Sequence, residues 1–218
     1  MNASELIAKT LVDNKISKIF SIVRGGSMYL NDAFGHNQKL KVIYNHHEQA
    51  SAIAAEAYAR LSNKIAVVCV TSGPGGTNAT TGCLCGYMGS IPMLIISGQV
   101  RKKYTTNLSK LKLRTIGEQE VDIIKIVSGI TKYSKILTKK NEIAKEINKA
   151  IHIATTGRPG PVWLDVPLDI QSENIKNVKQ KIFKKQIKKF KIPQSLLDKI
   201  LAKIIKTNGL RLLMNVII

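Results

Sequence analysis

Short apolar runs alternate with longer amphipathic segments along the first 170 residues. Apolar runs predict strands at residues 16–23, 41–44, 65–70, 91–97, 132–136 and 161–166. The run at 65–70 lacks alternation, which is typical of a strand buried on both faces, and the run at 41–44 is also expected to be buried. Helices are predicted at residues 2–14, 28–34, 48–61, 77–88, 121–127 and 142–155. The repeated strand, turn and helix predict an α/β fold, with a mostly parallel sheet covered by helices on both faces.

Residues 42–78 combine a strand, a lone carboxylate and a helix. Glu48 follows the run 41–44 and opens the next helix. In open α/β sheets, such a position faces the ligand crevice at the carboxyl ends of the strands. Position alone is explained more simply by a solvated glutamate that favours the helix dipole. The apolar residues that recur at helical spacing after it are Ile53, Ala54, Ala57, Tyr58 and Leu61.

Two glycine-rich turns follow predicted strands. Arg24, Gly25 and Gly26 follow the first strand, and residues 71–78, TSGPGGTN, follow the run 65–70. Glycine permits unusual backbone dihedrals and lets another molecule approach the backbone closely. The second turn is neither a GxGxxG nor a Walker motif. Taken alone, it fits a plain strand-to-helix connection at least as well as a ligand-binding loop.

Several longer motifs carry a family resemblance. They read HEQ (47–49), AAEAYAR (54–60), VTSGPGGTN (70–78), SIPMLIISGQV (90–100), GEQEVDI (117–123), ITKYS (130–134) and TGRPGPVWLDVP (156–167). In this order they resemble the first, pyrimidine-binding domain of thiamine-diphosphate enzymes of the acetolactate synthase type. The resemblance implies a lyase or carboligase that acts on 2-oxo acids.

The resemblance also implies roles for individual residues. Glu48 would hydrogen-bond a ring nitrogen of the cofactor's aminopyrimidine, favouring the tautomer that removes a proton from the thiazolium carbon. Gln119 would be a second catalytic residue at the reacting centre. With Glu48, the expected cofactor-binding residues are Gly25, Gly26, Ser72, Gly73, Pro74, Gly75 and Asn78.

Three positions depart from the family pattern. Arg24 replaces a proline, Glu118 an aromatic residue, and Leu168 a lysine. All three belong to the wall that faces the substrate in the family, so they leave cofactor handling intact and leave the product open. The planar guanidinium of Arg24 would suit a substrate carboxylate or phosphate. An exposed surface arginine is an equal alternative.

Charge divides the chain into regions. Lys and Arg number 34 against 14 acidic residues, and residues 171–218 hold twelve of these bases with two acids. We expect a pyrimidine-binding domain at 1–170, a basic linker at 171–194, and the start of a middle domain at 195–218, with a helix at 195–205. Basic and apolar residues interleaved at 180–191 would also suit nucleic acid. Without an accompanying nucleic-acid-binding motif, the solvated linker is favoured.

The cysteines and the lengths of the apolar runs indicate where in the cell the protein is located. Cys69, Cys83 and Cys85 lack metal-ligand spacing, which favours buried apolar residues in a reducing cytosol. No apolar run reaches the ~18 residues that span a bilayer, and no signal-peptide pattern opens the chain. The sequence predicts a cytoplasmic protein without a membrane or metal site of its own.

Half of the family's cofactor site has no counterpart in this sequence. No GDG segment is present, which in the family holds Mg²⁺ and, through it, the diphosphate. The sequence ends in LRLLMNVII, inside the expected middle domain, which favours a truncated enzyme, inert alone, over one subunit of a split enzyme. Expected partners are a second copy in a homodimer or a chain carrying the diphosphate-binding domain. FAD, bound in the family mostly through the middle domain, is not inferable from these residues.

Overall fold

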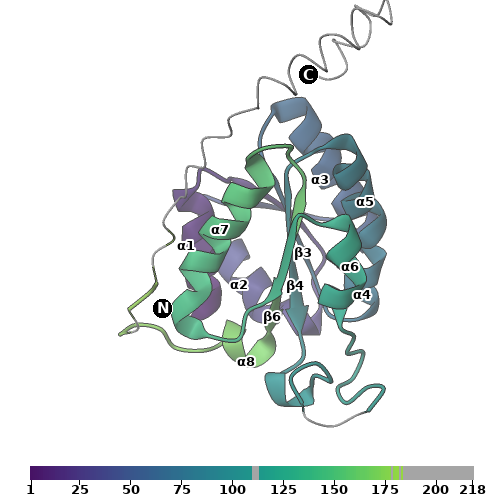
Figure 1. Cartoon of the computed structure of the whole chain (residues 1–218). Coiled ribbons are helices and arrows are strands. Elements are labelled where there is room, and N and C mark those ends of the chain that lie inside the picture. Colours follow the sequence, from purple (N-terminus) through teal and green to yellow (C-terminus); the bar gives the residue numbers. More distant parts are fainter. Residues whose placement is uncertain (110–112, 178, 182, 184–218) are drawn as a thin grey trace, which may run out of the picture. The chain divides into compact units, whose positions relative to one another are not determined.

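Six parallel strands form one sheet in the computed structural model, which describes residues 1–109, 113–177, 179–181 and 183. The strand order is β2-β1-β3-β4-β6-β5 (Figure 1). This confirms the predicted α/β class. The strands are β1 (Lys18–Ser21), β2 (Lys41–Tyr44), β3 (Ala66–Val70), β4 (Met93–Gln99), β5 (Tyr133–Ile136) and β6 (Pro161–Pro167).

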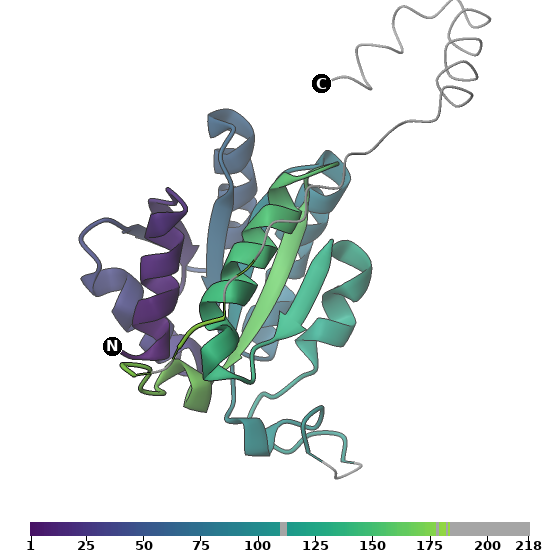
Figure 2. The same cartoon turned by 60° about the vertical axis from the view of Figure 1, so that its left-hand side comes forward.

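Helices cover both faces of the sheet, as Figures 1 and 2 show. One face carries α1 (Ala3–Asp13), α2 (Met28–His36) and α7 (Ile143–Thr155), with α8 (Leu168–Gln171) at its end. The other face carries α3 (Glu48–Ser62), α4 (Pro74–Asn78), α5 (Thr80–Gly89) and α6 (Ile123–Val127). Short 3-10 turns are η1 (Gly25–Ser27), η2 (Lys102–Tyr104), η3 (Ser128–Ile130) and η4 (Lys140–Glu142).

The central strands are buried because each face packs into an apolar layer. In β3, Val67 and Cys69 join the layer under α1, α2 and α7, while Val68 and Val70 join the layer under α3, α5 and α6. Every residue of β3, β4 and β6 is buried. Double coverage therefore accounts for the continuous apolar runs of the sequence.

One prediction in this region was wrong. Strand β2, expected to be buried, lies at the edge of the sheet with Lys41 and Tyr44 exposed. In α3, Ile53 and Leu61 are exposed, while small residues such as Ala52 point inward. A Cβ added at Gly82 of α5 would lie 2.5 Å from the Cβ of Ala52, so the two helices pack too closely for larger side chains.

The cysteines are divided between core and surface. Cys69 and Cys83 are buried free thiols, as predicted. Cys85 is exposed, because it lies on the outer side of α5, one residue before the buried Gly86.

The chain reverses its direction across the sheet between β1 and β3. From β1 it passes to β2 on one side, and it returns to place β3 and then β4 on the other side. Loops that follow strands on either side of such a switch point diverge and open a crevice at the carboxyl ends. The turns after β1 and β3 contain the glycines singled out in the sequence.

The first residues of the chain pair with residues that follow α8. Asn2 and Asn174 form an antiparallel bridge, and the Ala3 amide donates to the Glu173 carbonyl at 3.0 Å. Ile175 is buried in the α1 layer. The predicted linker 171–194 is only partly described. The predicted helix 195–205, the domain start 195–218 and the apolar end 210–218 lie outside the described residues.

Candidate functional site

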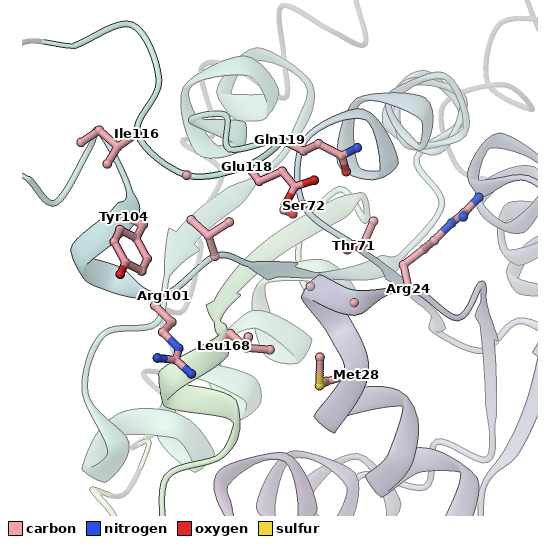
Figure 3. A pocket seen from close by; sticks show the side chains of 14 residues that line it. Arg24, Met28, Thr71, Ser72, Arg101, Tyr104, Ile116, Glu118, Gln119 and Leu168 are labelled. Atoms are coloured by element: carbon pink, nitrogen blue, oxygen red, sulfur yellow. The ribbon is translucent and has the colours of Figure 1, made fainter.

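A cavity of about 600 Å³ opens at the carboxyl ends of four strands. Its walls come from the segments that follow β1, β3, β4 and β6, together with residues 116–119. In Figure 3, Glu118 and Gln119 lie on one side, Met28 and Leu168 on the opposite side, and Arg24 and Arg101 at the two ends. The lining residues are Arg24, Gly25, Gly26, Met28, Thr71, Ser72, Val100, Arg101, Tyr104, Ile116, Gly117, Glu118, Gln119 and Leu168.

The cavity brings together residues that lie far apart in the sequence. Gly25, Gly26, Ser72 and Gln119, all predicted as site residues, line it. The three positions that depart from the family pattern, Arg24, Glu118 and Leu168, line it as well. The wall of this cavity therefore includes all three positions at which this sequence departs from the family pattern.

Charge is distributed unevenly around the cavity. Arg24 and Arg101 are exposed, and neither guanidinium group has a hydrogen-bond or ion-pair partner among the described residues. Glu118 is the acidic residue of the lining, and much of the remaining wall is apolar. Free guanidinium groups beside apolar surface suit a small anion that carries an apolar substituent.

Glu48 is the first residue of α3 and is only 5% exposed. Its Oε2 accepts a hydrogen bond from the side-chain amide of Asn78 at 3.0 Å. Its Oε1 accepts none from any residue that the structure describes. Oε1 is not among the fully buried atoms that lack a partner, so it is open to a hydrogen-bond donor from a ligand or from solvent.

Gly75 has no side chain, and this leaves the space beside the Glu48 carboxylate open. A Cβ added at Gly75 would lie 3.3 Å from the Glu48 Oε1 and 2.5 Å from the Thr71 Cγ2. Thr71 also lines the cavity. Glu48 itself does not line the cavity. The predicted residues around Glu48 and the predicted residues that line the cavity are therefore neighbours, with Thr71 next to both groups. Pro74, also predicted as a site residue, is the first residue of α4 and lies outside the lining.

The turn after β3 packs directly on the segment that carries Gln119. Gly73 has φ +56°, and a Cβ added there would lie 2.0 Å from the Gln119 carbonyl oxygen. Gln119 also adopts a positive φ, 57°, which is unfavourable for a residue with a side chain. The predicted Gly73 and Gln119 thus meet through their backbones.

Several polar residues behind the cavity escaped the sequence prediction. Gln171 is fully buried, and its Nε2 donates to the carbonyls of Gly26 and Val166, each at 2.8 Å. Asp165 in β6 and Gln99 in β4 are each 2% exposed and are hydrogen-bonded to each other at 3.0 Å. The available signal was a polar residue within each apolar run, because a buried polar side chain requires a partner.

Burial raises the pKa of the Asp165 carboxyl to about 7, against an ordinary value of 3.8. Hydrogen bonds from Ser97 and Gln99 oppose this rise, whereas the nearby carboxylates of Asp122 and Glu120 add to it. No cation is bonded to Asp165 among the described residues. Within the same residues, no group of three or more His, Cys, Asp and Glu is placed to hold a metal ion, and no helix is long and apolar enough to cross a lipid bilayer.

Comparison with known proteins gives one family and several relatives. Residues 1–126 match the family described as thiamine pyrophosphate enzyme, N-terminal TPP binding domain. The chain is 38% identical over 176 residues to the acetolactate synthase large subunit of Haemophilus influenzae, covering 81% of this chain and 29% of that protein. It is 39% identical over 170 residues to the acetolactate synthase large subunit of Buchnera aphidicola subsp. Schizaphis graminum, covering 78% and 28%.

A plant relative extends the comparison. Identity to the chloroplastic acetolactate synthase of Arabidopsis thaliana is 32% over 170 residues, covering 78% of this chain and 24% of that protein. The chain therefore spans less than a third of the length of each of these curated relatives.

Proposed function

Because the chain belongs to the thiamine pyrophosphate enzymes, as the N-terminal TPP binding domain of an acetolactate synthase-like enzyme, we propose that Glu48 is its contact with the cofactor. In this proposal, the chain forms the pyrimidine-binding half of a thiamine-diphosphate site. The other half, with Mg²⁺ and the diphosphate, comes from a domain that these residues do not include.

The observation that carries the proposal is the asymmetry of the Glu48 carboxylate. Asn78 occupies Oε2, and Oε1 accepts no hydrogen bond within the described part of the chain. A carboxylate held in this way presents one oxygen to a donor from outside. A protonated ring nitrogen or a ring nitrogen that shares a proton with Glu48 is such a partner.

The residues beside Glu48 fit a flat heterocycle. The 3.3 Å between the Glu48 Oε1 and a Cβ added at Gly75 means that a side chain there would fill the approach to this oxygen. Glycine leaves that approach open. Of the predicted cofactor-binding residues, Asn78 then acts by orienting Glu48, and Gly75 acts by leaving space.

Glu48 serves this site by holding or donating a proton at Oε1. Thiamine diphosphate, when bound, supplies a thiazolium carbon that adds to the carbonyl of a 2-oxo acid. Asn78 fixes the orientation of the carboxylate, so that the proton is held at a defined atom. Gln119, on the cavity wall, is proposed to contact the reacting substrate.

The adjacent cavity is proposed to receive the 2-oxo acid. Arg24 and Arg101 would attract its carboxylate, and the apolar wall at Met28 and Leu168 would contact its side chain. Since Arg24, Glu118 and Leu168 all differ from the family pattern, the product is expected to be set by this wall, while Glu48 handles the cofactor.

We further propose that the complete site requires a partner. A homodimer, or association with a chain carrying the diphosphate-binding domain, would supply the missing half. The outer faces of α3 and α5 support an interface, because they expose the large apolar residues Ile53, Leu61, Leu84, Tyr87 and Met88. Exposed apolar patches of this kind often mark interaction sites. The boundaries 1–170, 171–194 and 195–218, and a cytoplasmic location, belong to the same proposal.

Binding of a pyrimidine fragment tests the role of Glu48 in the full chain without the missing half. The probe is 4-amino-5-hydroxymethyl-2-methylpyrimidine, followed by ligand-observed NMR. We expect Glu48→Gln to weaken binding by about tenfold to a hundredfold, because a hydrogen bond to a charged group contributes about 1.5–3 kcal/mol.

Glu56→Gln is the matched control for this experiment. Glu56 lies on the same helix, is also largely buried, and pairs with Arg60 one turn further along. We expect the Glu56→Gln chain to bind the pyrimidine fragment with wild-type affinity. Absence of binding to the wild-type chain, or equal binding by Glu48→Gln, would overturn the proposal.

A further inference from the structure

The segment that carries Gln119 is held in an unfavourable backbone conformation. Gln119 has φ 57°, the left-handed region, which residues with side chains adopt rarely. Such a conformation persists only where the surroundings over-determine it. The structure must therefore contain contacts that fix residues 117–121.

One such contact is the side chain of Gln99, at the end of β4. Its Nε2 donates to the Val121 carbonyl at 3.0 Å and to the Asp165 Oδ2 at 3.0 Å. Its Oε1 accepts from the Val100 amide at 3.0 Å. Both faces of the amide are thus satisfied, and the neighbouring donor and acceptors fix which way the side chain is turned.

Asp165 is in turn fixed by the neighbouring strand. Its Oδ1 accepts from the Ser97 hydroxyl at 2.6 Å, and Ser97 accepts from the Trp163 Nε1 at 2.8 Å. Asp165 and Ser97 are paired residues of β6 and β4. The chain of hydrogen bonds therefore begins in the rigid centre of the sheet and ends on the backbone of segment 117–121.

A second contact holds the same segment to the preceding loop. The Glu120 Oε1 accepts from the Thr106 amide at 3.1 Å and from the Thr106 hydroxyl at 2.9 Å. The Glu120 amide donates to the Gly117 carbonyl at 3.2 Å. These two amide hydrogens report directly on whether the segment keeps its conformation.

We propose that Gln99 and Asp165 are positioning residues, which hold segment 117–121, and with it Gln119, against the glycine-rich turn after β3. Neither residue lines the cavity. They act through the backbone of Val121, two residues from Gln119. The effect on catalysis rests on the proposed function, whereas the positioning itself does not.

Amide hydrogen exchange in the full chain, without any ligand, tests this inference. Gln99→Met removes both donated hydrogen bonds while keeping a side chain of similar length. We expect the Glu120 and Thr106 amides to exchange faster by on the order of tenfold or more, because local opening exposes them. The Val68 amide in β3 should keep its wild-type rate. Unchanged exchange at Glu120 and Thr106 would overturn the proposal.

Two further variants separate positioning from general stability. Asp165→Asn keeps the size and one acceptor for Gln99, and we expect it to retain wild-type exchange at Glu120 and Thr106. Asp165→Leu removes every acceptor, and we expect it to behave like Gln99→Met. Equal exchange in these two variants would contradict a positioning role.

A measurement on the wild-type chain covers the case in which a variant fails to fold. The side-chain amide protons of Gln99 should exchange much more slowly than those of Gln49, which lies at the start of α3 and whose side chain makes no hydrogen bond to the residues that the structure describes. Equally fast exchange of both side chains would overturn the inference. The pyrimidine-binding experiment uses a different residue and probe, so either proposal fails without the other.

Discussion

Single residues in this chain are fixed by a few specific contacts. Glu48 is an example, because one oxygen of its carboxylate is bonded to Asn78 and the other has no partner among the described residues, and our proposal for the cofactor rests on this asymmetry. Gly75, which lies beside this carboxylate, has no side chain. At Gly75 a methyl group would approach both Glu48 and Thr71. The site thus depends on the absence of a side chain at Gly75 as much as on the carboxylate of Glu48.

The buried carboxyl of Asp165 predicts a pH dependence of stability. Its pKa of about 7 in the folded chain lies above the ordinary 3.8, so between these values the folded state binds the proton and the unfolded state does not. The free energy of unfolding therefore falls as pH rises from about 4 to about 7. At about 1.4 kcal/mol for each pH unit between the two pKa values, the loss is about 4 kcal/mol.

Urea unfolding at several pH values measures this effect. Asp165→Asn removes the titrating group, so its stability relative to the wild type should rise as pH increases through this range. Glu120 and Asp122, the acidic neighbours of Asp165, remain in both proteins. A difference between the two proteins that stays constant with pH would contradict the prediction.

At the scale of elements, α3 is positioned by its contact with α5. A Cβ added at Gly82 would lie 2.5 Å from the Ala52 Cβ and 2.6 Å from the Ala52 carbonyl carbon. The backbone of Ala52 cannot rotate away as a flexible side chain could, so any side chain at Gly82 must push α3 and α5 apart. Because Glu48 is the first residue of α3, this contact also determines where the carboxylate lies.

Gly82→Ala tests the packing of these helices. We expect it to lower the free energy of unfolding by about 1–3 kcal/mol, the usual cost of overpacking, and to weaken binding of the pyrimidine fragment. Gly89→Ala on the same helix is the control, since its added Cβ would meet the mobile end of the Arg60 side chain. Similar losses of stability in the two variants would argue against close packing as the cause.

Sequence patterns predicted the elements well and their surroundings less well. Continuous apolar runs correctly located β3 and β4, because double coverage leaves a local signature. The burial of β2 was misjudged, and the pattern did not show which face of α3 points inward. An edge position depends on strand order, and bulky apolar residues such as Leu61 outweigh alanine in any pattern, although here the alanines face the core.

The site was predictable where its residues lie close together in sequence. Glu48, Gly75 and Asn78 fall within one strand–helix–strand stretch, and motif resemblance identified them as candidates. Gln99 and Asp165 were missed because 66 residues separate them and only the pairing of β4 with β6 brings them together. Arg101 and Tyr104 were missed because the loop after β4 has no periodic pattern.

At the scale of the whole molecule, residues that follow the last described helix contact the start of the chain. Residues 173–175 pair with the N-terminus, and Ile175 is buried against the α1 layer. Lys181 reaches back to Glu142 at 2.6 Å. These contacts tie the segment after α8 to the N-terminus and to η4.

Two shortened chains test how much this segment contributes. A chain ending at residue 172 keeps α8 but loses the burial of Ile175, and we expect a free energy of unfolding lower by about 2 kcal/mol or more than that of a chain ending at residue 183. Thermal and urea unfolding of both chains give the comparison. Equal stability would show that the pairing with the N-terminus contributes nothing measurable.

The strand order has a consequence for how the polypeptide acquires its structure. Strand β6 comes last in the sequence, yet it lies between β4 and β5, and within the described sheet β5 has no other neighbour. Pairing between distant segments is slow, because the entropy of closing the intervening loop is lost before contacts form. We therefore expect β1 to β4 to assemble early in refolding and β6 to insert late. Asp165 arrives with β6, so the region around Gln119 becomes ordered only in the final kinetic step.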